Sequence, residues 1–193
     1  VFTKSAMIER DFELHRQYRH NCFLVWSVTT CDEKIRRIIE PGTPPASRIF
    51  KVIKKFADAD LCCGVNIDPI MPLVTDSEQD LEKLVGACRE AGVRHLFGAP
   101  LRLRKDIWQR MKLVLRLLEV PDGIKIYKEI YGFEEPLDSS YVTADTRYIN
   151  KIICKLESMI KRNGLIPDFP DYLAPKKICK SSLGQTTLQS FLV

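Results

Sequence analysis

The sequence predicts an α/β fold of parallel strands joined by crossover helices, followed by a helical C-terminal extension and a flexible tail. Short apolar runs rich in β-branched and aromatic residues alternate with amphipathic stretches as far as Leu118. Alternation of this kind implies parallel strands with right-handed connections. It stops at Pro121, after which the patterns are helical and then broken by prolines. We therefore divide the chain into residues 1–120, a helical extension over 121–164, and a loop and tail over 165–193.

Composition sets the class of protein. The 193 residues are enough for one domain with a core, and a hydrophobic fraction of 45% with 28% charged residues is typical of globular chains. No apolar run approaches the roughly 18 residues that cross a bilayer, so we expect no membrane partner. The net charge of +5 permits an acidic partner such as nucleic acid without requiring one.

The cysteines indicate the cellular compartment of the protein, and the first residue bears on whether the sequence is part of a longer protein. Seven cysteines lie at irregular spacings, without a disulfide framework or a CxxC zinc pair, which favours a reducing cytoplasm. No signal peptide is visible. The chain begins with Val1 and enters an expected strand almost at once, so we expect it to be a piece of a longer protein.

The predicted elements follow in order from these patterns. We expect strands over 1–5, 22–30, 61–67 and 93–99, and helices over 8–18, 47–59, 124–131 and 148–162. Apolar residues at helical spacing predict two further helices. The first contains Leu81, Leu84, Val85 and Cys88. The second contains Ile107, Met111, Leu115 and Leu118. Asp76 is the expected N-cap of the first of these and Gly92 its C-terminal stop; Asn163 and Gly164 end the last helix.

The rest of the chain is organised around the stretch from Leu24 to Pro45, LVWSVTTCDEKIRRIIEPGTPP. It opens as a buried strand that delivers hydroxyl groups to its C-terminal end. A short helical turn with Ile35, Ile38 and Ile39 on one side follows, and Glu40-Pro41-Gly42 stops it because proline disfavours the helical region for the preceding residue. Strand ends of this kind are where α/β proteins build ligand sites.

Lys4 and Ser27 are the strongest candidates for ligand binding. Each sits at the C-terminal end of a predicted strand, on the face where β/α folds bind ligands, and an ammonium with a hydroxyl suits a carboxylate. The alternative is a solvated lysine and an ordinary polar residue at a strand end. Glu40 is either a pocket carboxylate, salt-bridged to Arg36 or Arg37, or simply the end of a short helix.

Four motifs in order resemble the radical SAM enzymes of the spore photoproduct lyase-like group. The pattern S-x-T-T, nine residues, then E-P-G-T-P is the main one. The others are Phe2-Thr3-Lys4-Ser5 followed by Arg10-Asp11, then Pro69-Ile70-Met71-Pro72, then Leu101-Arg102-Leu103-Arg104 after a strand. The match covers roughly residues 1–120. It implies a partial, open β/α barrel of which this chain is the C-terminal portion.

The resemblance also implies a cofactor and a reaction. In that family the residues matching Lys4 and Ser27 hold the carboxylate and amino-acid end of S-adenosylmethionine, and Ser5 is a weaker candidate beside them. The implied reaction is reductive cleavage of S-adenosylmethionine to a 5′-deoxyadenosyl radical. The CxxxCxxC motif that binds the family's 4Fe–4S cluster is absent, and the seven cysteines are not placed to replace it. The resemblance therefore places the cluster only in a longer protein that contains this motif upstream.

Two further features suggest partners. Arg102, Arg104, Lys105, Arg110 and Lys112 form the densest basic cluster, with Trp108 among them. This cluster either contacts the phosphates of DNA, with the ring available for stacking, or is a solvated helix face, which is the commoner explanation.

The extreme C-terminus carries a second pattern, Q-x-x-L-x-x-F-L, at Gln185, Leu188, Phe191 and Leu192. It resembles the PCNA-interacting peptide (PIP box) of replication and repair proteins, in its archaeal form. One helical turn places the three apolar residues on one face as a plug for a groove on the sliding clamp, PCNA. The alternative is a tail that packs back on the domain.

The sequence thus supports one main hypothesis and two rivals. The main one is the S-adenosylmethionine-binding part of a radical SAM enzyme related to DNA repair and recruited by the sliding clamp. The first rival is a non-catalytic α/β module that binds nucleic acid or the clamp. The second is an unrelated α/β domain.

Overall fold

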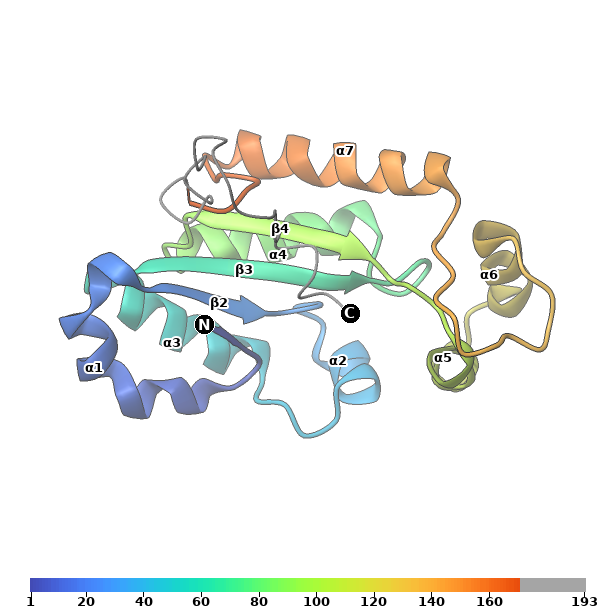
Figure 1. The fold of residues 1–193 in the computed structure, drawn as a ribbon, viewed down its shortest axis with the longest axis horizontal. Coiled ribbons are helices and arrows are strands. Elements are labelled where there is room, and N and C mark those ends of the chain that lie inside the picture. Colours follow the sequence, from blue (N-terminus) through green and yellow to red (C-terminus); the bar gives the residue numbers. More distant parts are fainter. Residues whose placement is uncertain (171–193) are drawn as a thin grey trace, which may run out of the picture.

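The computed structural model describes residues 1–170, which form an open sheet of four parallel strands in the order β1-β2-β3-β4. The strands are β1 (Phe2–Thr3), β2 (Phe23–Ser27), β3 (Cys62–Ile70) and β4 (His95–Pro100). All three pairings are parallel and follow chain order, and helices connect the strands (Figure 1). The predicted partial α/β barrel is confirmed.

One face of the sheet carries the main core. The helices α3 (Ala46–Asp58) and α4 (Glu78–Glu90) lie behind the sheet in Figure 1, and α7 (Thr146–Arg162) runs along β4. Their apolar stripes pack on the alternate residues of the strands that face them. The largest side chains in this core are Trp26, Phe56, Leu24, Ile49 and Ile53, all less than 2% exposed.

A second apolar cluster lies beyond the carboxyl end of β4. It is built by α5 (Lys105–Leu117) and α6 (Gly123–Tyr131), with α2 (Glu33–Ile39) packed against it. Two buried tyrosine hydroxyls fix α6 to the loops that leave the strands: Tyr127 donates to the Pro72 carbonyl at 2.9 Å and Tyr131 to the Leu101 carbonyl at 2.6 Å. The carboxyl ends of the strands therefore lie between two separate cores.

The connection after β1 differs from its prediction. The sequence predicts one helix over 8–18, whereas the structure has a 3-10 helix, η1 (Ala6–Asp11), then α1 (Phe12–Gln17), and a short 3-10 turn, η2 (Arg19–Asn21). Asp11 joins the first two with φ −98° and ψ 20°, outside the α-helical region. The apolar residues of this segment are spaced for one helix, but the backbone tightens at its start.

The start of α4 is also corrected. Asp76 is not its N-cap; the Ser77 hydroxyl has that place and accepts from the Asp80 N–H at 3.1 Å. The Asp76 carboxylate instead accepts from the Leu73 N–H at 2.8 Å and from the Tyr148 hydroxyl at 2.9 Å, so it joins this loop to α7. Burial raises the pKa of Tyr148, and the neighbouring Asp76 charge adds to the shift.

The helix ends agree better with the sequence. Gly92 follows the C-cap of α4 with φ +78°, and Gly164 follows the C-cap of α7 with φ +73°. Both positions require the left-handed region that glycine adopts without steric cost. None of the helices within residues 1–170 is long and apolar enough to cross a membrane.

Candidate ligand site at the strand ends

The register of the sheet creates a polar row on the face opposite the main core. Ser27 pairs with Asn66, and Asn66 pairs with Phe97. Successive side chains of a strand point to opposite faces. The preceding row, which contains Trp26 and Val65, is fully buried against the helices, whereas Ser27, Asn66 and Phe97 are only half-buried. The Ser27 hydroxyl therefore lies on the face opposite the main core, half-buried at the end of β2, while Phe97 in the same row stacks on Phe169 with the ring centroids 4.4 Å apart.

Lys4 extends the same row to the edge strand. It directly follows Thr3, which pairs with Trp26, so Lys4 stands beside Ser27 in the register. Its side chain is 44% exposed, and its ammonium is ion-paired with the Oε1 atom of Glu40. Lys4 and Ser27 thus lie at the carboxyl ends of neighbouring strands, where the sequence places them.

Ser5 has a different position. Its hydroxyl accepts from the Met7 N–H at 3.0 Å and caps η1, and its own N–H donates to the Thr3 hydroxyl at 2.9 Å. A hydroxyl that is used as a cap is held in one orientation. Ser5 therefore fixes the chain directly after Lys4.

Asp68, which the sequence analysis did not select, adds a carboxyl group to this edge. The pKa of Asp68 is raised because the carboxyl group is partly desolvated beside the sheet, although the side chain keeps contact with solvent. Three neighbours oppose this shift, namely Arg102, the Asn66 amide and Lys4. The edge thus combines an ammonium, a hydroxyl, an amide and a carboxyl group. In the sequence, the polar Asn66 and Asp68 within an apolar run are the signal that could have identified them.

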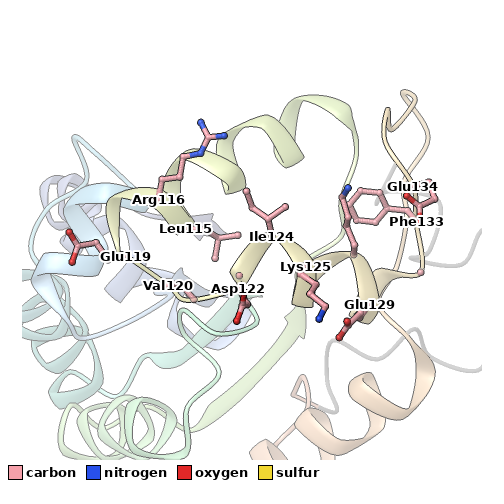
Figure 2. A pocket seen from close by; sticks show the side chains of 13 residues that line it. Leu115, Arg116, Glu119, Val120, Asp122, Ile124, Lys125, Glu129, Phe133 and Glu134 are labelled. Atoms are coloured by element: carbon pink, nitrogen blue, oxygen red, sulfur yellow. The ribbon is translucent and has the colours of Figure 1, made fainter.

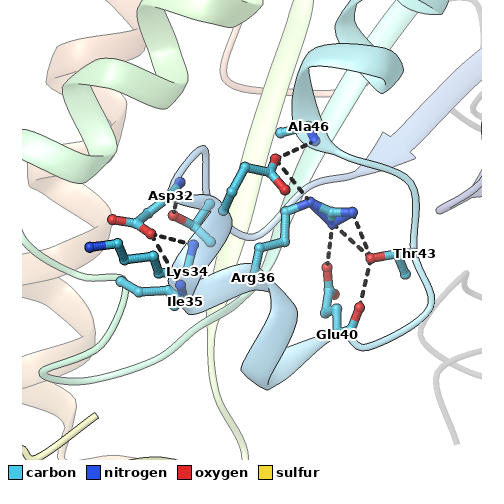
Figure 3. A network of polar contacts seen from close by, with 9 residues as sticks. Asp32, Lys34, Ile35, Arg36, Glu40, Thr43 and Ala46 are labelled. Carbon is cyan, nitrogen blue, oxygen red and sulfur yellow. Dashed lines mark hydrogen bonds and ion pairs between the residues drawn. The ribbon is translucent and has the colours of Figure 1, made fainter.

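A buried arginine organises the turn after α2. Arg36 is 3% exposed, and both of its terminal nitrogens donate to the Thr43 hydroxyl, at 2.7 and 2.6 Å (Figure 3). Its Nη1 lies 3.7 Å from the Oε2 atom of Glu40. Its Nε lies 3.6 Å from Glu33, whose carboxylate also accepts from the Ala46 N–H at 2.7 Å, at the start of α3.

This arrangement explains the E-P-G-T motif. The Thr43 N–H donates to the Glu40 carbonyl at 3.2 Å, which closes a four-residue turn with Pro41 and Gly42 in the middle. Proline at the second position and glycine with φ +88° at the third are typical of a type II turn. The turn brings Thr43 back under the guanidinium of Arg36 and leaves the Glu40 side chain between that group and Lys4.

The basic cluster after β4 does not offer the ring that the sequence suggested. Trp108 is 1% exposed, and its indole N–H donates to Glu135 at 3.1 Å, so it is a core residue. The exposed ring is Tyr141, which is 53% exposed. The guanidinium carbons of Arg102 and Arg104 lie 5.0 and 5.3 Å from its centroid. Tyr141 lies on an irregular segment, where periodicity gives no signal.

A separate cavity lies away from the strand ends. It has a volume of about 860 Å³ and lies between the end of α5 and α6 (Figure 2). Its lining includes two basic residues, Arg116 and Lys125, and two acidic residues, Glu119 and Glu129. This mixture selects no class of ligand.

The described residues also provide no metal centre. Within residues 1–170, no three Cys, His, Asp or Glu side chains converge in a way that could hold an ion. Burial raises the pKa of the Cys31 thiol to about 11 and that of Cys63 to about 12, so both stay protonated at neutral pH. A protonated thiol is a poor metal ligand.

The comparison with curated sequences finds relatives over part of the chain. No protein-family model matches the chain. Uncharacterized protein ORF301 of Acidianus two-tailed virus is 30% identical over 124 residues, which are 58% of this chain and 41% of that protein. An uncharacterized protein of Mycobacterium tuberculosis is 28% identical over 145 residues, which are 73% of this chain and 42% of that protein.

Solved structures of spore photoproduct lyase superpose on this chain. One variant matches with a TM-score of 0.62 and 12% identity, covering 86% of this chain and 49% of the lyase. A variant with bound AdoMet and dinucleoside spore photoproduct matches with a TM-score of 0.60 and 13% identity over the same shares.

The chain shares the fold of the matched part of spore photoproduct lyase. It spans less than half the length of the curated relatives and about half of the lyase.

Proposed function

We propose that this chain is the S-adenosylmethionine-binding part of a radical SAM enzyme that resembles spore photoproduct lyase and acts in DNA repair. The observation that carries the proposal is the position of Lys4 and Ser27 at the carboxyl ends of neighbouring strands. Both lie in one register row of a sheet whose fold matches an AdoMet-bound lyase.

The groups at this edge suit the amino-acid end of S-adenosylmethionine. The Lys4 ammonium is a partner for the carboxylate, and the Ser27 hydroxyl can donate to that carboxylate or accept from the α-ammonium. The Asp68 carboxyl group, near Lys4 and Asn66, offers a second acceptor for a cation.

The described residues, 1–170, do not suit an iron–sulfur cluster. Three converging thiolates are needed, and residues 1–170 bring no such group together. When a cluster is bound, it supplies the electron that cleaves S-adenosylmethionine. In this proposal it belongs to a segment outside this chain, and the residues described here bind and orient the cofactor.

The first test is anaerobic reconstitution with iron and sulfide. The 193-residue chain alone should retain no stoichiometric cluster, because the sequence lacks CxxxCxxC and the cysteines within residues 1–170 do not converge. The longer protein, extended by the coding sequence upstream of Val1, should retain one and release 5′-deoxyadenosine from S-adenosylmethionine when reduced with dithionite. A cluster on the short chain, or no 5′-deoxyadenosine from the longer protein, would contradict the proposal.

DNA is the proposed substrate partner, through the exposed ring of Tyr141 and the two guanidinium groups beside it. An aromatic ring flanked by arginines suits a base and its phosphates. Arg102 also lies near Asp68, so this surface adjoins the candidate ligand site. Because the solved lyases include one complexed with dinucleoside spore photoproduct, the repair of a DNA lesion is the activity that we favour.

We further propose that the C-terminal tail recruits the protein to the sliding clamp. Gln185, Leu188, Phe191 and Leu192 lie outside the described residues, so the argument is the sequence pattern alone. A tethered peptide of this kind would bring the enzyme to DNA without a large basic surface, in keeping with a net charge of only +5.

The clamp proposal is tested with a synthetic peptide of residues 180–193. We expect micromolar binding to the PCNA of the source organism by calorimetry, because three apolar side chains on one helical turn fill a groove. Leu188→Ala with Phe191→Ala should abolish binding, whereas Ser182→Ala, outside the motif, should not change it. Equal binding by the double variant and the native peptide would exclude this role.

A non-catalytic module that binds nucleic acid or the clamp remains the second candidate function. The arginine-flanked Tyr141 favours it, since that surface needs no cofactor. The reconstitution test distinguishes the two candidates, because a non-catalytic module would yield no 5′-deoxyadenosine with any upstream segment.

A further inference from the structure

We propose that Glu40 is a positioning residue for Lys4, and that the buried Arg36 and Thr43 hold Glu40 in place for this task. This inference rests on the proposed function, because it explains how the chain would prepare Lys4 for the carboxylate of S-adenosylmethionine. It assigns a role to the E-P-G-T turn, which lies beside the strand ends.

The two oxygens of the Glu40 carboxylate face different cations. Oε1 contacts the Lys4 ammonium, and Oε2 lies 3.7 Å from Nη1 of Arg36. The Glu40 side chain is 13% exposed, between a lysine that is 44% exposed and an arginine that is 3% exposed. Glu40 therefore links the interior of the turn to the solvent-facing ligand edge.

The Thr43 hydroxyl fixes the interior end of this link. Its oxygen accepts from both terminal nitrogens of Arg36 and donates its hydrogen to the Glu40 carbonyl at 2.8 Å (Figure 3). A hydroxyl has one donor and two acceptor sites, so all three are in use. The guanidinium cannot turn without breaking these bonds, and the Glu40 carboxylate is oriented in consequence.

The charges also suit a ligand carboxylate. In a lone Lys4–Glu40 pair, the Glu40 carboxylate would repel the carboxylate of a ligand and so reduce the attraction of the Lys4 ammonium. Arg36 offsets the charge of Glu40 from the other side, while Glu33 beside Arg36 is offset in turn by the first N–H of α3. An ammonium has three donors, so its contact with Glu40 leaves donors for a ligand.

Positioning matters because a lysine side chain is flexible. Holding one long side chain in a single conformation costs free energy that must otherwise come from ligand binding. An ammonium already held beside Glu40 avoids part of that cost. Loss of the Glu40 charge should weaken binding by about 2- to 12-fold, which corresponds to the roughly 0.5–1.5 kcal/mol of one immobilised side chain.

The test is a double-mutant cycle on Lys4 and Glu40. Dissociation constants for S-adenosylmethionine are measured by calorimetry in the longer, cluster-containing protein. We expect Glu40→Gln to weaken binding about 2- to 12-fold in the native background and to cause no weakening in the Lys4→Ala background, because Glu40 helps binding only through Lys4. Glu78→Gln is the matched control, since Glu78 pairs with Lys155 at 3.1 Å in an exposed ion pair between α4 and α7.

A second readout needs no cofactor. In the free 193-residue chain, the two ε protons of a held Lys4 should give distinct NMR signals, and Glu40→Gln should merge them while Glu78→Gln leaves them apart. Two results would overturn the positioning role. One is unchanged or tighter binding in the single variant Glu40→Gln. The other is that Glu40→Gln weakens binding in the Lys4→Ala background as much as it does in the native protein. If the native protein binds no S-adenosylmethionine, the proposed function itself fails.

Discussion

Lys4→Ala and Ser27→Ala should each weaken the binding of S-adenosylmethionine by about 10- to 100-fold. A lost hydrogen bond to a charged group is worth about 1.5–3 kcal/mol, and each factor of ten in affinity is about 1.4 kcal/mol. Lys4 should have the larger effect, because its ammonium neutralises the ligand carboxylate as well as donating to it. The dissociation constants are measured by calorimetry in the longer, cluster-containing protein.

Two control variants separate site effects from general ones. Lys155→Ala removes another lysine that is paired with a glutamate, and Ser47→Ala removes an exposed hydroxyl on α3; neither should change the affinity. Thermal unfolding should show that all four variants are folded. Native affinity in both Lys4→Ala and Ser27→Ala would exclude the assigned roles.

Arg36→Met should destabilise the protein by about 2–4 kcal/mol. Removing one partner of a buried ion pair costs about 3–5 kcal/mol because the remaining charge is left uncompensated, and the partial exposure of Glu33 reduces that figure here. The change also removes both donors to Thr43. For a protein of this size, the loss lowers the Tm by roughly 5–15 °C in calorimetric unfolding.

Arg37→Met is the natural control, because Arg37 is the next residue of α2 and is exposed. Its effect should stay within about 0.5 kcal/mol. Combining Arg36→Met with Glu33→Gln and Glu40→Gln should recover part of the stability, since the uncompensated charges disappear. If Arg36→Met unfolds at the same temperature as Arg37→Met, the turn does not depend on the buried guanidinium.

The order of strands and helices was predictable because each element has a clear period. The buried run of β2 and the amphipathic stripe of α3 each identify one element, and their alternation implies the parallel sheet. The end of β3 was harder to place. The sequence predicts a strand over 61–67, but the strand continues through Pro69 to Ile70 because a register shift lets it rejoin β4.

The candidate site was predictable only in part. Lys4 and Ser27 stand at strand ends, and position along a strand can be inferred from the sequence. The role of Arg36 could not be inferred from the sequence, because the burial of Arg36 depends on a turn that brings Thr43 back to α2. Trp108 was misjudged for a similar reason: its neighbours in sequence are basic, but its own side of α5 faces the second core.

The most direct test of the account is to locate the S-adenosylmethionine site on this chain. The ligand is titrated to millimolar concentration into the ¹⁵N-labelled 193-residue protein, and amide shifts are followed by NMR. We predict that the largest shifts are those of Lys4, Ser27, Asn66 and Asp68, at the carboxyl ends of the strands. Shifts that cluster instead around Gly123 and Gly132 at the α5–α6 cavity, or no shifts at all, would contradict the central claim.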